Sequence, residues 1–226
     1  MNKYQEYINK YVNEIKETLK DELLLVLIIG SSCSDEVIEN WSDIDSILVL
    51  KNYDFKTINI IKEISNSYPV KIGTTIYDKR ELEEKNIDPK TIYHLYLLKN
   101  KLIDLQYKSN DIKIPDIEFK DVYDSHLPYL YWSLHIYKRN FLYDTLTKEQ
   151  IKSVFKTTYL IMKAILIIDG EKPKNYRDVF TTFSKKYNYQ YYDFESFISN
   201  YIADNDKYSD IVEYGKEFLL NIMKRF

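Results

Sequence analysis

Two apolar segments separated by a short polar connection most strongly constrain how this chain folds. The first, Leu23–Ile29, is apolar throughout and ends at Gly30; the second begins with Asp43-Ile44-Asp45. An unbroken apolar run of this length is typical of a strand that is buried on both faces. Because alternate residues of a strand share a face, we expect Asp43 and Asp45 to project together while Ile44 points into the core. The pattern predicts paired carboxylates at the start of a second strand.

Paired carboxylates of this kind indicate a site for a cation, since two adjacent negative charges repel each other. Mg²⁺ prefers hard oxygen ligands and keeps waters and substrate phosphates as its other ligands. The turn at Gly30 and Ser31 precedes a candidate helix at Ser34–Glu39, and it can offer backbone N–H groups and a hydroxyl to phosphates. Asp43 and Asp45 are therefore candidate metal ligands beside a candidate phosphate-binding turn.

These residues resemble the signature of the nucleotidyltransferase superfamily related to DNA polymerase beta, in which an apolar strand and Gly-Ser are followed by Asp-x-Asp at the next strand. Here eleven residues separate Ser31 from Asp43, and the pair is written Ser42-Asp43-Ile44-Asp45. The motif covers residues 23–50, and a similar layout extends to residue 107. Within the superfamily, the chain is most similar to bacterial and archaeal types with a small catalytic domain followed by helices. Aminoglycoside nucleotidyltransferases and minimal nucleotidyltransferases with HEPN-like helices are built in this way.

The resemblance implies a reaction and a set of site residues. Asp43 and Asp45 would hold Mg²⁺ on a nucleoside triphosphate, with ATP as the expected co-substrate, and Gly30, Ser31 and Ser42 would contact the nucleotide. An acceptor hydroxyl would attack the α-phosphorus and pyrophosphate would leave, so positioning and charge neutralisation would do most of the work. The acceptor is expected to be a small molecule of aminoglycoside type, or a Tyr, Ser or Thr of a partner protein.

The sequence departs from the family pattern at a third carboxylate, which normally lies on the neighbouring strand and completes the metal site. The expected strand, Val70–Tyr77, contains no acid, and Gly73 or Thr74 stands at the expected place. Substitutes from elsewhere remain open: Asp78, Asp104, and the helical-region acids Glu149 and Asp144. The alternative hypothesis is a catalytically impaired nucleotide-binding or interaction protein that lacks this carboxylate.

Apolar spacing predicts the remaining elements and an α+β fold class. Helices are expected over residues 3–20, 56–66, 79–85 and 88–98, and further strands over 70–77 and 102–105. Beyond Pro115, helices are expected over residues 147–168, 175–187, 192–203 and 207–225. The sequence thus predicts a small mixed-sheet nucleotidyltransferase domain over residues 1–114 and an all-helical bundle over residues 115–226.

Charge and cysteine content narrow the class of protein. The net charge is −3 and there is no long basic run, which argues against nucleic acid as a partner and suits a cationic small molecule or a protein. The single cysteine, Cys33, excludes an internal disulfide and fits a reducing compartment. Because no signal segment or bilayer-length apolar run is present, we expect a cytoplasmic protein with no membrane partner. The sequence leaves a homodimer open.

Three further groups of residues are interpreted as structural. Cys33 is read as a filler of a tight turn, and the histidines lack the spacing of a metal site. Lysines along one predicted helix are read as a solvated face, although one of them could meet a triphosphate. An aromatic cluster after Pro128 is read as core. The residues concerned are His94, His126, His135, Lys152, Lys156, Lys163, Tyr129, Tyr131 and Trp132.

Overall fold

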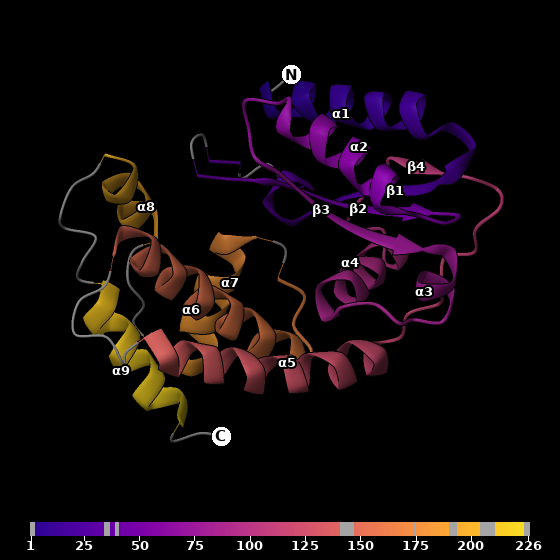
Figure 1. The fold of residues 1–226 in the computed structure, drawn as a ribbon. Helices are drawn as coiled ribbons and strands as arrows, with labels where there is room; N and C mark the ends of the chain where they lie inside the picture. Colours follow the sequence, from indigo (N-terminus) through magenta and orange to yellow (C-terminus); the bar gives the residue numbers. More distant parts are fainter. Residues whose placement is uncertain are drawn as a thin grey trace. The chain divides into compact units, whose positions relative to one another are not determined.

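The computed structural model describes residues 3–33, 37–38, 41–140, 147–173, 175–189, 194–203 and 211–223. The chain forms two compact units, Met1–Val122 and Tyr123–Phe226 (Figure 1). The first unit contains a mixed sheet with helices, and the described residues of the second are helical apart from their connections. The expected α+β fold class is therefore confirmed. The domain division expected after residue 114 stays a prediction.

The first unit follows the predicted order of elements, with small shifts at their ends except at the fourth strand. It runs α1 (Lys3–Leu19), η1 (Lys20–Glu22), β1 (Leu23–Ile29), η2 (Gly30–Cys33), β2 (Ile44–Leu50), α2 (Phe55–Asn66), β3 (Ile72–Asp78), α3 (Lys79–Glu83), α4 (Pro89–Lys99), β4 (Tyr107–Lys108) and the start of α5 (Phe119–Asn140). The helix expected at Ser34–Glu39 falls mostly outside the described residues.

The sheet has the order β3-β2-β1-β4, with β2 and β3 parallel and β1 antiparallel to both β2 and β4. Every residue of β1 is buried, as its unbroken apolar sequence predicts. Figure 1 shows α1 and α2 over one face of the sheet and α3 and α4 over the other. The register places Ile29 and Gly73 on either side of Asp45, so the start of β2 lies between two backbones.

The fourth strand differs from the prediction, which placed it at Leu102–Leu105. The backbone N–H of Leu102 donates instead to the carbonyl of Leu97 at 2.9 Å, so this segment closes the end of α4. The pairing with β1 begins at Gln106, whose N–H donates to the Val26 carbonyl at 3.2 Å. The strand is therefore Tyr107–Lys108, because the chain must first finish the turn after α4 before it reaches the sheet edge.

Aspartate side chains begin three successive helices of this unit: Asp54 at α2, Asp78 at α3 and Asp88 at α4. Asp88 accepts a hydrogen bond from the Thr91 N–H at 3.0 Å, and Pro89 occupies the first turn of α4, as the sequence predicts. Asp78 accepts from the Glu81 N–H at 2.8 Å and forms a capping box at the start of α3. The carboxyl of Asp78 is therefore used by the helix that follows β3.

The second unit contains the rest of α5 and α6 (Lys148–Ile168), α7 (Tyr176–Tyr187), α8 (Phe194–Ile202) and α9 (Ile211–Met223). Aromatic side chains form much of its core: the rings of Phe155 and Phe197 stack with centroids 4.4 Å apart. The helix α6 ends at Ile168 and is followed by Asp169-Gly170, as the sequence predicts; the φ of +86° at Gly170 is readily adopted only by glycine. Among the described residues, we find no helix with the length and apolar character needed to span a membrane.

Candidate functional site

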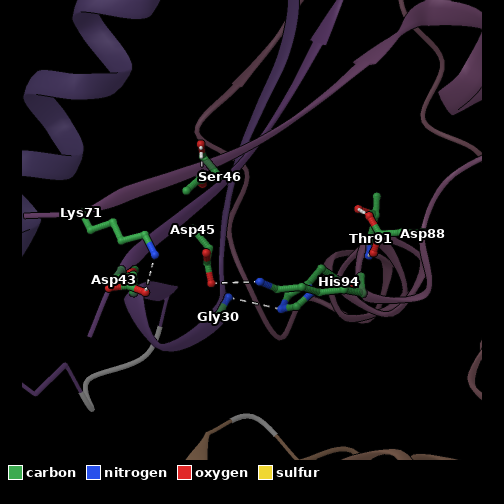
Figure 2. A network of polar contacts seen from close by, with 11 residues as sticks. Gly30, Asp43, Asp45, Ser46, Lys71, Asp88, Thr91 and His94 are labelled. Carbon is green, nitrogen blue, oxygen red and sulfur yellow. Dashed lines mark hydrogen bonds and ion pairs between the residues drawn. The ribbon is translucent and has the colours of Figure 1, made fainter. Parts of the chain in front are cut away.

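The two predicted metal ligands lie where β2 begins, Asp43 just before the strand and Asp45 within it (Figure 2). Ile44 between them is fully buried. This confirms the expected alternation along the strand. The Asp43 and Asp45 side chains are 28% and 36% exposed, so solvent reaches both. A lysine accompanies each carboxylate: Lys71 Nζ is 3.9 Å from Asp43 Oδ2, and Lys90 Nζ is 2.9 Å from Asp45 Oδ2. Two negative and two positive charges thus meet at this edge of the sheet.

The carboxylate of Asp45 lies between two glycines. A Cβ atom built on Gly30 would come within 3.0 Å of Asp45 Oδ2, and one built on Gly73 within 3.0 Å of Asp45 Oδ1. Gly30 also has a φ of +74°, in the left-handed region that side chains with a Cβ rarely adopt. The missing side chains at these two positions therefore leave the space that the carboxylate occupies.

His94 connects the turn after β1 to the helix α4, and its ring is buried (Figure 2). Its Nδ1–H donates to the Lys90 carbonyl at 2.6 Å, while Nε2 accepts from the Gly30 N–H at 3.3 Å. These roles place the ring proton on Nδ1 and leave Nε2 as an acceptor. The sequence indicates only a packing or surface role for His94, because Gly30 is 64 positions away along the chain.

The polar residues of the predicted phosphate turn have partners within the protein. The Gly30 N–H donates to His94, so the bond that it was expected to offer a phosphate is already made. Ser42 is buried, and its hydroxyl accepts from the Ile38 N–H at 2.9 Å. Ser31 follows Gly30 in η2 and is half-buried. Nucleotide contacts by Gly30, Ser31 and Ser42 remain predictions.

A layer of hydroxyls lies on the opposite face of β2 and β3. The Tyr11 hydroxyl from α1 is 3.1 Å from Ser46 Oγ and 2.9 Å from Thr74 Oγ1. Burial raises the pKa of Tyr11, so the hydroxyl stays neutral and remains a donor. Ser46 and Thr74 directly follow Asp45 and Gly73 on the two paired strands. The hydroxyls therefore fix the register in which Asp45 faces Gly73.

Of the sequence-predicted substitutes for the third carboxylate, the two in the first unit, Asp78 and Asp104, do not join the Asp43–Asp45 pair. Asp78 pairs in register with Leu50, at the other end of β2 from Asp45. Asp104 lies in the exposed connection after α4, Glu149 belongs to α6 in the second unit, and Asp144 lies outside the described residues. Over the described ranges, no group of three or more His, Cys, Asp and Glu side chains is arranged to hold a metal ion.

The donor set nevertheless fits a Mg²⁺ ion that takes only part of its coordination from protein. Two carboxylates offer the hard oxygen atoms that Mg²⁺ prefers, and this ion commonly keeps waters and substrate phosphates as its remaining ligands. The position of the Asp45 side chain between Gly30 and Gly73 also favours a metal ligand, because it fixes a partly exposed carboxylate at the strand edge. Asp43 and Asp45 are the residues that would hold the ion.

Comparisons with known proteins find likeness among solved structures only. No protein-family model matches the chain, and no curated protein sequence matches it. Among solved structures, the chain is similar to the spectinomycin adenyltransferase AAD(9) from Enterococcus faecialis, whose structure contains ATP and spectinomycin. The TM-score is 0.48 at 15% sequence identity, and the match covers 95% of this chain and 98% of that chain. A likeness at this level does not establish the family or the activity of the chain.

Proposed function

We propose that this chain is a nucleotidyltransferase that moves a nucleoside monophosphate, AMP from ATP, to a hydroxyl group of an acceptor. The observation that carries the proposal is the Asp45 carboxylate held between Gly30 and Gly73, with Asp43 on the same strand edge. Both carboxylates are partly exposed and already attract a cationic side chain. The negative charge of the two carboxylates would also attract a divalent cation that carries a triphosphate.

The reaction that suits these residues is an in-line transfer of a nucleotidyl group. When bound, Mg²⁺ would offset the negative charge that builds on the α-phosphate and on the leaving pyrophosphate. Asp43 and Asp45 would hold this ion at the strand edge. The acceptor hydroxyl forms the new bond to the α-phosphorus as the bond to pyrophosphate breaks. Because β3 places Gly73, and no acid, opposite Asp45, we assign the proton of the hydroxyl to solvent. Catalysis then rests on positioning and charge neutralisation.

The acceptor belongs to one of two classes. A small molecule of aminoglycoside type suits the net charge of −3, because such a molecule is cationic. A Tyr, Ser or Thr hydroxyl of a partner protein is the other class, and it requires the same attack on the α-phosphorus. The two classes are distinguished by the size of the labelled product.

A second candidate function is nucleotide binding without transfer. It is favoured by the register of Gly73 with Asp45 and by the use of Asp78 as a helix cap, which together leave β3 without a carboxylate for the pair. This candidate predicts that a nucleoside triphosphate binds with Mg²⁺ and that no product forms.

The test is incubation of the purified chain with α-labelled ATP, GTP, CTP or UTP and Mg²⁺, together with an aminoglycoside panel that includes spectinomycin, or with cell lysate. The double variant Asp43→Asn/Asp45→Asn should lose label transfer and pyrophosphate release. The matched control is Asp54→Asn, because Asp54 caps α2 and asparagine caps helices equally well. Metal-dependent nucleotide binding without transfer would support the second candidate, and absence of both would exclude the two together.

A further inference from the structure

We propose that Lys90 exchanges between two partners: it occupies the cation position on Asp45 when the site holds no nucleotide, and it binds the triphosphate once a divalent cation takes that carboxylate. This inference rests on the proposed function, since it assumes that Asp45 is a metal ligand. It adds a phosphate-binding residue that the sequence motif does not contain.

The first support is the position of the Lys90 ammonium. Lys90 Nζ donates to Asp45 Oδ2 at 2.9 Å, and Oδ2 is the carboxylate oxygen that lies beside Gly30. The other oxygen, Oδ1, lies against Gly73. A divalent cation on Oδ2 and the ammonium on the same atom repel each other, so binding of the cation weakens the lysine contact.

The second support is the way in which the backbone of Lys90 is held. The His94 ring accepts from the Gly30 N–H and donates to the Lys90 carbonyl, so it connects the turn to the first turn of α4. The Lys90 side chain is 49% exposed and has a flexible stem. The ammonium can therefore leave Asp45 by side-chain rotation while its backbone stays beside the turn.

The third support is the hydrogen bond that the turn has already made. Because the Gly30 N–H donates to His94, this amide does not supply the phosphate contact expected from the sequence. A lysine ammonium is a common phosphate ligand and acts as a point charge. Once released from Asp45, the Lys90 ammonium supplies positive charge at the same turn. A nucleoside triphosphate should gain the most binding affinity from this ammonium, because its negative charge is concentrated on its terminal phosphates.

The second lysine of the site provides a matched comparison. Lys71 Nζ is 3.9 Å from Asp43 Oδ2, and its side chain is 77% exposed. At this distance and exposure an ion pair contributes little, because water and salt screen it. Removing the charge of Lys71 should therefore change cation and nucleotide binding much less than removing the charge of Lys90.

The experiment measures two affinities in the wild-type chain and in Lys90→Met, Lys71→Met and Asp45→Asn. Mn²⁺ is titrated without nucleotide and followed by electron paramagnetic resonance, and a non-hydrolysable ATP analogue is then titrated with Mg²⁺ by calorimetry. Lys90→Met should bind Mn²⁺ about two- to fivefold more tightly, the effect of one partly exposed ion pair. It should bind the nucleotide analogue about tenfold more weakly, because one charge-assisted phosphate contact is lost. Lys71→Met should change both affinities less, and Lys90→Arg should stay near the wild type because it keeps the charge.

The two affinities of Lys90→Met must move in opposite directions for the inference to hold. If neither affinity changes while Asp45→Asn still loses Mn²⁺, the role of Lys90 is wrong and the metal site of the proposed function stands. If both affinities fall together, Lys90 is a structural or steering residue and the exchange is again wrong. If neither the wild type nor Lys90→Met binds Mn²⁺, the proposed function fails together with the inference.

Discussion

The substitution Gly30→Ala combines two penalties that other glycines of the chain show separately. At Gly30, the φ of +74° and a Cβ position 3.0 Å from Asp45 Oδ2 both oppose a side chain. Gly73 lacks the positive φ but has the same close approach, to Asp45 Oδ1. Gly170 has a φ of +86° and nothing within 4 Å of its Cβ position. The three alanine variants therefore separate two contributions to the loss of stability: the cost of the left-handed backbone and the cost of crowding the Asp45 carboxylate.

The size of each part follows from these geometries. A left-handed backbone costs an alanine about 1–2 kcal/mol, which is the whole effect expected for Gly170→Ala. Crowding of a packed position costs about 1–3 kcal/mol, which is the effect expected for Gly73→Ala. Gly30→Ala should lower the free energy of unfolding by roughly the sum, about 2–5 kcal/mol. It should also lower Mn²⁺ affinity, since the displaced carboxylate is the proposed ligand.

The assay is urea unfolding followed by tryptophan fluorescence, with Mn²⁺ titration of each folded variant. The chain has two tryptophans, Trp41 in the first unit and Trp132 in the second, so Trp132→Phe and Trp41→Phe backgrounds report on one unit at a time. Gly73→Ala should lose Mn²⁺ affinity, and Gly170→Ala should keep it. Equal stability loss and equal Mn²⁺ affinity in Gly30→Ala and Gly170→Ala would refute the claim that Gly30 makes room for Asp45.

Two further predictions concern His94 and Tyr77. His94→Leu removes the acceptor of the Gly30 N–H, so we expect the free energy of unfolding of the first unit to fall by about 1–3 kcal/mol in urea and nucleotide binding to weaken. The control is His126→Leu, which removes another buried histidine. An equal loss of nucleotide binding in the control would contradict the positioning role of His94. Burial, and then a hydrogen bond to the Asp88 carboxylate, raises the pKa of Tyr77 to about 12 from 10.0. The folded chain therefore keeps this proton between about pH 10 and 12 while the unfolded chain releases it, so the free energy of unfolding should fall as the pH rises through this window. Tyr77→Phe should make that fall shallower, and an unchanged pH slope would argue against the shift.

The sequence predicted those parts of the fold that depend on local patterns. The unbroken apolar run Leu23–Ile29 forms the predicted strand, and Asp88-Pro89 begins a helix where capping chemistry requires it. The alternation around Ile44 was also predictable, because it follows from the period of a strand. The fourth strand was placed too early, since the sequence does not show that the residues after α4 first bond back to the helix.

The contacts of the site were not predictable, because they join residues far apart along the chain. Lys90 lies 45 positions from Asp45, and no local period relates the two. Gly73 was read only as the absence of an acid, whereas the structure shows that it makes room for Asp45. The sequence offered one signal. Lys90 and His94 are four positions apart on one predicted helix, and this spacing places both on the same face.

The most direct test of the account is calorimetric titration of a non-hydrolysable ATP analogue, with and without Mg²⁺, into the wild-type chain, Asp45→Asn and the control Asp54→Asn. If Asp45 holds the metal ion, the wild type and Asp54→Asn should bind the analogue only when Mg²⁺ is present. Asp45→Asn should lose that binding while circular dichroism and urea unfolding show a folded protein. Equal nucleotide affinity in the wild type and Asp45→Asn would contradict the assignment of Asp45 as a metal ligand, and with it the proposed function.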